Sequence, residues 1–278
     1  MQKTFNFQKG FITLPGAIII AAAIIAIAII WVNKPAGNPA TAAQKKQPAE
    51  QIHIAPVTTA EHILGNPNAD VKIVEYSDPS CPYCKTFNPV MAKIMDEYGP
   101  TGKVAWIYRH YPLDKPDSEG RILHPNAGHE AQALECAASL GGNTKFWAFE
   151  KQLYTITPSV TPQSPEGLDQ KKLPGIAKSA GIDPVAFNEC LTSGQFKSKV
   201  ETQFLDGVNA NVTGTPTSFF LLSDTVPAAA VTYITNALLQ YRVPANLLYI
   251  SEDKKIIVMS GAMPEDLIKG LLTTLVGK

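Results

Sequence analysis

The 278-residue sequence lacks an excess of charge of either sign and has few charged residues at all. It holds 24 Lys and Arg against 24 Asp and Glu, and only 17% of its residues are charged. Nucleic-acid-binding proteins carry a basic excess that meets phosphates, so we expect no nucleic-acid partner. With 45% hydrophobic residues, the composition also argues against a disordered or coiled-coil protein.

Cysteine is scarce as well. Four cysteines in a chain of this length are too few for a small scaffold held together by disulfides. The length allows one large domain or two small ones. The role of each cysteine therefore has to be inferred from its surroundings.

One stretch lacks charge entirely. No charged residue occurs between Lys9 and Lys34, and residues 17–32 are all Ala, Ile, Trp or Val. As a helix, residues 11–32 are long enough to cross a hydrocarbon core of ~30 Å. We predict a short N-terminal tail (1–10) followed by a transmembrane anchor (11–32). The alternative is a cleaved signal peptide, whose apolar region usually has only ~7–15 residues.

The next segment lacks residues that could form a core. Residues 33–54 contain three prolines among Ala, Gln, Asn and Lys, which is typical of an extended, flexible tether. The remaining residues, 55–278, are within the size range of a single domain. Lysines flank the apolar span on both sides, so charge does not fix its orientation.

A cysteine pair follows the first predicted strand. The β-branched run 71–77 predicts a buried strand, and apolar residues after Cys84 repeat at helical spacing as far as Tyr98. This order places Cys81 at a helix N-terminus, where unpaired N–H groups and the helix dipole favour a thiolate. Cys84 lies one turn later, close enough to form a redox-active disulfide with Cys81.

Two other interpretations of Cys81-Pro82-Tyr83-Cys84 are open. Half of a zinc site has the same spacing, but the sequence offers no second cysteine pair to complete it. Two inert core cysteines would not require a strand, a turn and a helix around them. We therefore predict no metal and no bound cofactor.

Two further features are arranged around this pair. Glu75 lies in the apolar strand six residues before Cys81, where a buried carboxyl would have a raised pKa and could exchange protons with Cys84. The alternative is an exposed glutamate on an edge strand. Thr215-Pro216 precedes the apolar run 218–222, and a cis bond there would present the Thr215 backbone beside the cysteines, free to pair with an extended substrate.

These segments resemble the thioredoxin superfamily, and in particular its DsbA-like branch of exported thiol–disulfide oxidoreductases. The stretches that carry the resemblance are VKIVEYSDPSCPYC (71–84), WIYRHYPL (106–113), HPNAGHEAQALECA (124–137), FWAFEKQLY (146–154), FNECL (187–191) and GTPTSFFLL (214–222).

The resemblance implies an α/β, thioredoxin-like fold with a helical insertion at about residues 118–210. It implies that Cys81 is the exposed nucleophile, Cys84 its buried partner, Glu75 the buried acid and Pro216 the cis-proline. Pro82, Tyr83 and Thr215 would then border the substrate site. Glutaredoxin shares the Cys-Pro-Tyr-Cys tetrapeptide, but the long insertion and the predicted anchor argue against that cytosolic class.

The insertion holds the other two cysteines. We expect helices at 124–140, 143–155, 170–180, 183–192 and 196–208, with Cys136 and Cys190 on two of them. An even leftover pair in an oxidising compartment indicates a structural disulfide, and two buried free thiols are the alternative. His124, His129 and Glu130 do not share one helical face, so we expect surface or capping residues there rather than a metal site.

The C-terminal part departs from the family pattern. Apolar residues between about 224 and 250 predict an extra helix, and residues 247–251 and 255–259 predict strands before a final helix at 263–276. The extra segment could cover a substrate groove or be a peripheral addition.

The leading hypothesis is a single-pass protein of the cell membrane, with a catalytic domain on the extracytoplasmic side that oxidises cysteine pairs of exported or secreted proteins. A substrate thiolate would attack Cys81, and Cys84 would leave. The resemblance implies that a quinone-linked membrane partner then accepts the electrons. The alternatives are the reverse chemistry, as a reductase or isomerase, and a tethered binding module without turnover.

Overall fold

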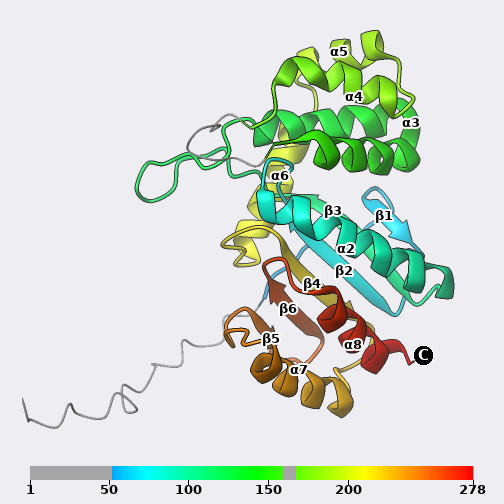
Figure 1. The fold of residues 1–278 in the computed structure, drawn as a ribbon, viewed down its shortest axis with the longest axis vertical. Coiled ribbons are helices and arrows are strands. Elements are labelled where there is room, and N and C mark those ends of the chain that lie inside the picture. Colours follow the sequence, from blue (N-terminus) through cyan, green and yellow to red (C-terminus); the bar gives the residue numbers. More distant parts are fainter. Residues whose placement is uncertain (1–51, 159–166, 278) are drawn as a thin grey trace, which may run out of the picture. The chain divides into compact units, whose positions relative to one another are not determined.

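The computed structural model describes residues 52–158 and 167–277. The predicted tail, anchor and most of the predicted tether lie outside the described residues. Within those two ranges, no helix is both long enough and apolar enough to cross a membrane. The described residues 52–158 and 167–277 form a mixed sheet with helices on both faces (Figure 1).

The sheet has six strands in the order β1-β3-β2-β4-β6-β5. Only β2 and β3 pair in parallel; the other neighbours are antiparallel. The strands are β1 (His62–Gly65), β2 (Val71–Ser77), β3 (Val104–His110), β4 (Thr217–Leu222), β5 (Leu248–Ile250) and β6 (Ile256–Ser260). The predicted α/β, thioredoxin-like arrangement is confirmed. Strand β1 was not predicted, because four residues followed by Asn and Pro are too few to show a strand period.

Successive side chains of a strand point to opposite faces of the sheet, so the central strands contribute to two different hydrophobic clusters. Val71 and Ile73 of β2 join a cluster with α2 (Pro82–Tyr98), α7 (Ala228–Gln240) and α8 (Glu265–Val276). Val74 and Tyr76 belong to the cluster on the opposite face of the sheet. Residues 52–57, which precede β1, and α6 (Lys197–Asn209) also contribute to this cluster. Helices therefore cover both sides of β2, and a polar group on this strand is cut off from water.

The helical insertion forms most of a third cluster, which also includes Cys81, Cys84 and Tyr108. It consists of α3 (Ala127–Ile156), the 3₁₀ turn η3 (Gln170–Lys172), α4 (Leu173–Ser179) and α5 (Pro184–Ser193), and it packs around Phe146, Phe149 and Phe187. The two helices expected at 124–140 and 143–155 are one broken helix, α3. The break falls at Gly142, whose φ of +70° is a conformation that favours glycine.

The C-terminal segment adds the helix α7 and the edge strand β5 to the sheet and its helices. The extra helix expected within 224–250 is α7, and β5 and β6 correspond to the two expected strands. Helix α7 packs with α8 on the same face of the sheet as α2, and Pro264 is the residue before the first turn of α8.

Candidate redox site

Cys81 lies at the N-terminus of α2, directly after the central strand β2. It is the N-cap residue, and Pro82 takes the first helical position, where a missing N–H is tolerated. The turn between strand and helix is closed by a 3.1 Å hydrogen bond from the Cys81 N–H to the Asp78 carbonyl. The free N–H groups and dipole of a 17-residue helix therefore act on the Cys81 sulfur.

Both cysteines of the pair are free thiols, and both are buried. Cys84 is fully buried and Cys81 is only 3% exposed, so the expectation that Cys81 is exposed was wrong for this thiol state. The reason is the neighbouring loop: the Cys81 thiol donates to the Thr215 carbonyl over 3.4 Å. Cys84 Sγ accepts the Asp78 N–H at 3.5 Å.

The two thiols have opposite acidities. A hydrogen bond from the Cys84 thiol lowers the pKa of Cys81 to about 6, although burial opposes it. Burial, together with the same hydrogen bond to Cys81, raises the pKa of Cys84 well above its ordinary value. Near neutral pH, Cys81 is therefore the thiolate and Cys84 the thiol.

Glu75 lies in β2 between β3 and β4 and is only 2% exposed, rather than at a sheet edge. The indole N–H of Trp106 donates to its carboxyl over 2.9 Å. Burial raises the pKa of Glu75 to about 7, and its charge in turn contributes to the raised pKa of Cys84. A carboxyl that is half protonated near neutral pH can both give and take a proton.

The predicted substrate-side residues lie at different depths. Tyr83 is 66% exposed and Pro82 is partly exposed, whereas Thr215 and Pro216 are buried. The Thr215–Pro216 bond is cis. The Thr215 hydroxyl is buried without a hydrogen-bond partner among the described residues. In the dithiol state, the Thr215 carbonyl is already engaged by Cys81.

Cys136 and Cys190 are joined by a disulfide, with their Cα atoms 5.9 Å apart. The bond connects α3 to α5 and lies in the core of the insertion. It is remote in sequence from the Cys81–Cys84 pair, so the chain contains one free pair and one bonded pair.

Sequence reasoning missed a polar cluster beside the cysteines. His124 and Glu130 were expected at the surface or as caps, but both are buried, and only His129 is exposed. His124 Nδ1 lies 2.7 Å from a carboxylate oxygen of Asp78, and the Ser80 hydroxyl donates to Glu130 over 2.8 Å. The expectation failed because the loop before α3 folds back onto the turn at residues 78–80, which no periodicity reveals.

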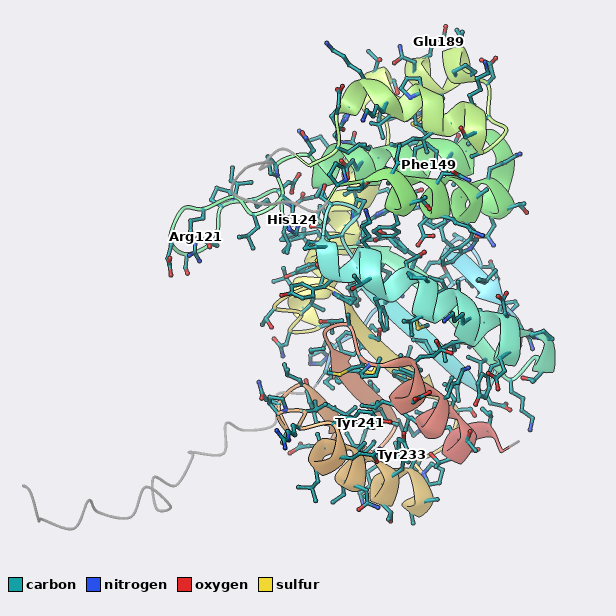
Figure 2. The ribbon with its side chains drawn as sticks, in the orientation of Figure 1. Arg121, His124, Phe149, Glu189, Tyr233 and Tyr241 are labelled. Atoms are coloured by element: carbon teal, nitrogen blue, oxygen red, sulfur yellow. A yellow bond between two sulfur atoms is a disulfide. The ribbon has the colours of Figure 1, made fainter. Side chains whose placement is uncertain are left out.

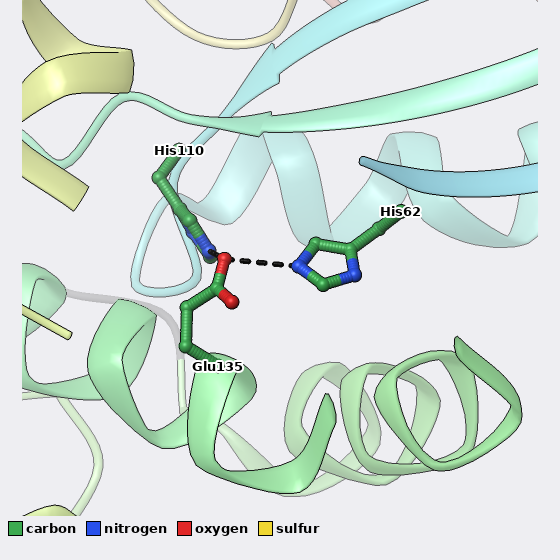
Figure 3. Close-up of side chains that lie close together, drawn as sticks. All are labelled: His62, His110 and Glu135. Atoms are coloured by element: carbon green, nitrogen blue, oxygen red, sulfur yellow. Dashed lines mark hydrogen bonds and ion pairs between the residues drawn. The ribbon is translucent and has the colours of Figure 1, made fainter. Parts of the chain in front are cut away.

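A second buried cluster could, by residue type, hold a metal ion. Nε2 atoms of His62 and His110 lie 2.9 and 3.0 Å from the same oxygen of Glu135 (Figure 3). Burial would raise the pKa of Glu135, but hydrogen bonds from His110 and His62 outweigh it and hold that pKa well below its usual range. The ammonium of Lys199 also donates to Glu135, over 2.7 Å. A cation thus already faces the carboxylate, and we interpret the cluster as a network that joins β1, β3, α3 and α6.

Comparison with known proteins identifies the domain. A family model described as thioredoxin matches residues 57–233, more than half of the chain. Among curated proteins, a probable disulfide bond formation protein D of Bacillus anthracis is 27% identical over 164 residues, covering 58% of this chain and 70% of that protein. The resemblance to DsbA-type proteins is thereby confirmed.

Other relatives are much longer than this chain. A Na⁺/H⁺ antiporter NhaA 1 of Mycolicibacterium gilvum is 26% identical over 161 residues. That match covers 57% of this chain but only 23% of the antiporter, and an NhaA 3 of Salinispora tropica is covered to 21%. The chain thus spans less than a quarter of these relatives.

Two solved structures show the same fold. BdbD of Bacillus subtilis is 25% identical with a TM-score of 0.52, covering 62% of this chain and 86% of BdbD. The α-DsbA1 of Wolbachia pipientis is 22% identical with a TM-score of 0.58, covering 80% of this chain and 93% of that one. The second likeness shows the fold alone.

Proposed function

The chain belongs to the thioredoxin family, and on that premise we propose that this DsbA-type thiol–disulfide oxidoreductase oxidises cysteine pairs of exported proteins. The observation that carries the proposal is the placement of Cys81 at the N-terminus of α2 with the Cys84 thiol as its hydrogen-bond partner. This arrangement stabilises the reduced enzyme as a Cys81 thiolate. A dithiol whose reduced form is stabilised is a strong oxidant.

The reaction starts from the Cys81–Cys84 disulfide. A substrate thiolate attacks Cys81 Sγ, the bond between the two enzyme sulfurs breaks, and Cys84 leaves with the electron pair. Because the Cys84 pKa is raised, this sulfur takes up a proton, which the neutral Glu75 carboxyl is placed to supply.

The second step releases the product. A second substrate thiolate attacks the substrate sulfur of the mixed disulfide, and Cys81 leaves as a thiolate. The substrate has then gained a disulfide, and two electrons remain on the enzyme's two sulfurs. An acceptor must remove these two electrons, and the Cys84 proton returns to the Glu75 carboxylate as the Cys81–Cys84 disulfide forms again. We propose a quinone-linked membrane protein as that acceptor.

Membrane tethering belongs to the same proposal. Residues 11–32 would hold the domain at the membrane, on the extracytoplasmic side, and residues 33–54 would give it reach toward emerging substrates. Supporting observations are the charge-free span and the disulfide between Cys136 and Cys190, which is typical of proteins in oxidising compartments.

The deciding experiment is the reduction potential of the Cys81–Cys84 pair, measured by equilibration with glutathione. We expect a value well above that of thioredoxin, about −270 mV, and nearer that of DsbA, about −120 mV. A value near thioredoxin's would show that the enzyme works as a reductant.

Replacing Cys81 tests whether chemistry is needed at all. The variant Cys81→Ser should oxidise no dithiol peptide, because the attacked sulfur is gone. The variant Glu189→Gln is the control, since this exposed side chain on α5 lies outside the redox site. Full activity of Cys81→Ser in folding of exported proteins would show that binding alone suffices.

A further inference from the structure

Asp78 contacts both active-site cysteines through its backbone. Its carbonyl accepts the Cys81 N–H at 3.1 Å, and its N–H donates to Cys84 Sγ at 3.5 Å. The side chain is completely buried, so its carboxylate oxygens depend on protein partners. One oxygen accepts the Ser80 N–H at 2.7 Å, and the other accepts the Leu113 N–H at 2.8 Å.

His124 supplies the only side-chain partner that the described residues give this carboxylate. It lies where the loop from β3 returns to the start of α3, beyond the projecting Arg121 (Figure 2). Its backbone is fixed at both ends, by its N–H to the Leu113 carbonyl and by its carbonyl to the Ala127 N–H. His124 is 7% exposed, and its imidazole reaches Asp78 over 2.7 Å. The helical insertion is thereby tied to the turn that carries Cys81.

We propose that His124 is a positioning residue for the redox pair: its protonated ring holds the Asp78 carboxylate and offsets that negative charge beside Cys81. Without this cation, the buried carboxylate would face the Cys81 thiolate unopposed. The inference refines the proposed function, on which it rests, by naming a group that sets how stable the Cys81 thiolate is.

The charges around His124 support this role. Burial opposes its protonation, but the hydrogen bond and charge of Asp78 outweigh burial and raise the pKa of His124, with the charges of Cys81 and Glu130 adding to the effect. Conversely, the charge of Asp78 works to raise the pKa of Cys81. Since Cys81 titrates at about pH 6, below the ordinary value for histidine, His124 is largely cationic where the thiolate forms.

Two other acids face the same region and must be considered. Glu130 of α3 accepts from Ser80, and burial raises its pKa to about 7, so it is neutral over much of the Cys81 titration. Asp114, in the loop after β3, has a pKa raised by burial and is close enough to feel the charge of Asp78. Neither acid can carry a positive charge, so neither can offset the negative charge of Asp78 in place of His124.

The test is the Cys81 pKa of the full chain, followed by thiolate absorbance. Gln keeps an N–H donor for Asp78 but carries no charge, so His124→Gln should raise the Cys81 pKa by about one unit. Such a rise from about 6 weakens the enzyme as an oxidant about fivefold at pH 7, or roughly 20 mV. The matched control, His129→Gln, removes an exposed histidine of α3 and should leave the Cys81 pKa unchanged.

A double variant separates charge from general disruption. With Asp78→Asn added to His124→Gln, neither charge remains, and the Cys81 pKa should return toward the wild-type value. An unchanged Cys81 pKa in the single variant, or no recovery in the double variant, would overturn the proposal. These readings do not depend on the direction of catalysis, so a reducing potential would refute the proposed oxidase and leave this inference standing.

A second measurement needs no variant. The NMR titration of the His124 ring should give a higher pKa in reduced than in oxidised protein, because only the reduced form places a thiolate at Cys81. Equal values in the two redox states would show that His124 and Cys81 are not coupled.

Discussion

At the scale of single residues, the two sulfurs of the site differ in proton affinity: Cys84 keeps its proton and Cys81 loses its own. Cys81 gains a hydrogen bond and the helix N-terminus, whereas Cys84 lies three residues inside α2 with no exposure to water. The same atom type therefore titrates below neutrality at one position and far above it at the other. Such a difference requires a proton carrier nearby, and Glu75 has the matching pKa of about 7.

Replacing Glu75 by Gln tests that carrier. Gln keeps an acceptor for the Trp106 indole but cannot transfer a proton, so we expect turnover at pH 7 to fall about 10²-fold while the Cys81–Cys84 disulfide still forms. Stopped-flow measurement of mixed-disulfide formation and resolution locates the loss. Unchanged mixed-disulfide formation in the variant would remove Glu75 from the mechanism, because Cys84 leaves and takes up its proton in that step.

The same substitution has a predictable effect on stability. The folded-state pKa of Glu75, about 7, lies above its ordinary value of 4.5. Stability from the neutral carboxyl is therefore complete below pH ~4.5 and is lost as pH rises through 7, by on the order of 3 kcal/mol. Glu75→Gln should thus gain stability over wild type in urea unfolding at pH 8 but not at pH 4. The exposed Glu189→Gln should show no such pH dependence.

At the scale of elements, the chain brings its two cysteine pairs into one buried cluster from different helices. The free pair lies at the start of α2, directly after the central strand β2, and the bonded pair joins α3 to α5. Helix α3 is also the element that presents Glu130, Glu135 and Glu150 to three separate buried networks. The insertion thus contributes directly to the surroundings of the site.

Removing the structural disulfide should weaken the insertion and spare the chemistry. Cys136 and Cys190 are 54 residues apart, and closing such a loop is worth about 4 kcal/mol in the chain-entropy model. We expect Cys136→Ala/Cys190→Ala to lose about that much stability while its turnover stays within a few-fold of wild type. Hydrogen exchange should increase first in α3–α5. Equal loss of protection in β2 would show that insertion and sheet unfold together.

At the scale of the whole molecule, the described domain is continuous with the predicted tether. The Ala55 N–H donates to Asp206 over 2.9 Å, and its carbonyl accepts from the buried Arg109. Ile52 and Ile54 also pack against the core, so the folded domain begins a few residues before the predicted end of the tether at residue 54.

Truncation tests the proposed anchor. The full chain should sediment with membranes, whereas a chain starting at residue 50 should be soluble and keep full dithiol oxidation activity. A chain starting at residue 58 lacks the contacts of Ala55 and should be less stable than the chain starting at residue 50. This comparison separates loss of the anchor from damage to the folded domain. Cys81 of the full chain should react with an impermeant thiol reagent in intact cells. Labelling only after lysis would place the domain on the other side.

Some site features followed from local sequence because they depend on neighbours in the chain. A β-branched run, a turn and an amphipathic helix place Cys81 at a helix N-terminus wherever the domain goes. The pairing of Cys136 with Cys190 and the burial of Glu75 were left open, since each depends on segments tens of residues away. The cluster of His124, Asp78 and Glu130 gave no local signal at all, because it forms only when the loop from β3 folds back.

By itself, the sequence determined the reacting groups: a Cys-x-x-Cys pair between a strand and a helix, and an acid six residues before it. It also determined a charge-free stretch long enough to cross a membrane. Only the tertiary structure decided the acidity and exposure of those groups. Proton affinity depends on burial and on partners brought together from distant segments, and these are consequences of packing. Thus the Thr215 carbonyl covers Cys81, two sheet neighbours enclose Glu75, and His124 faces Asp78.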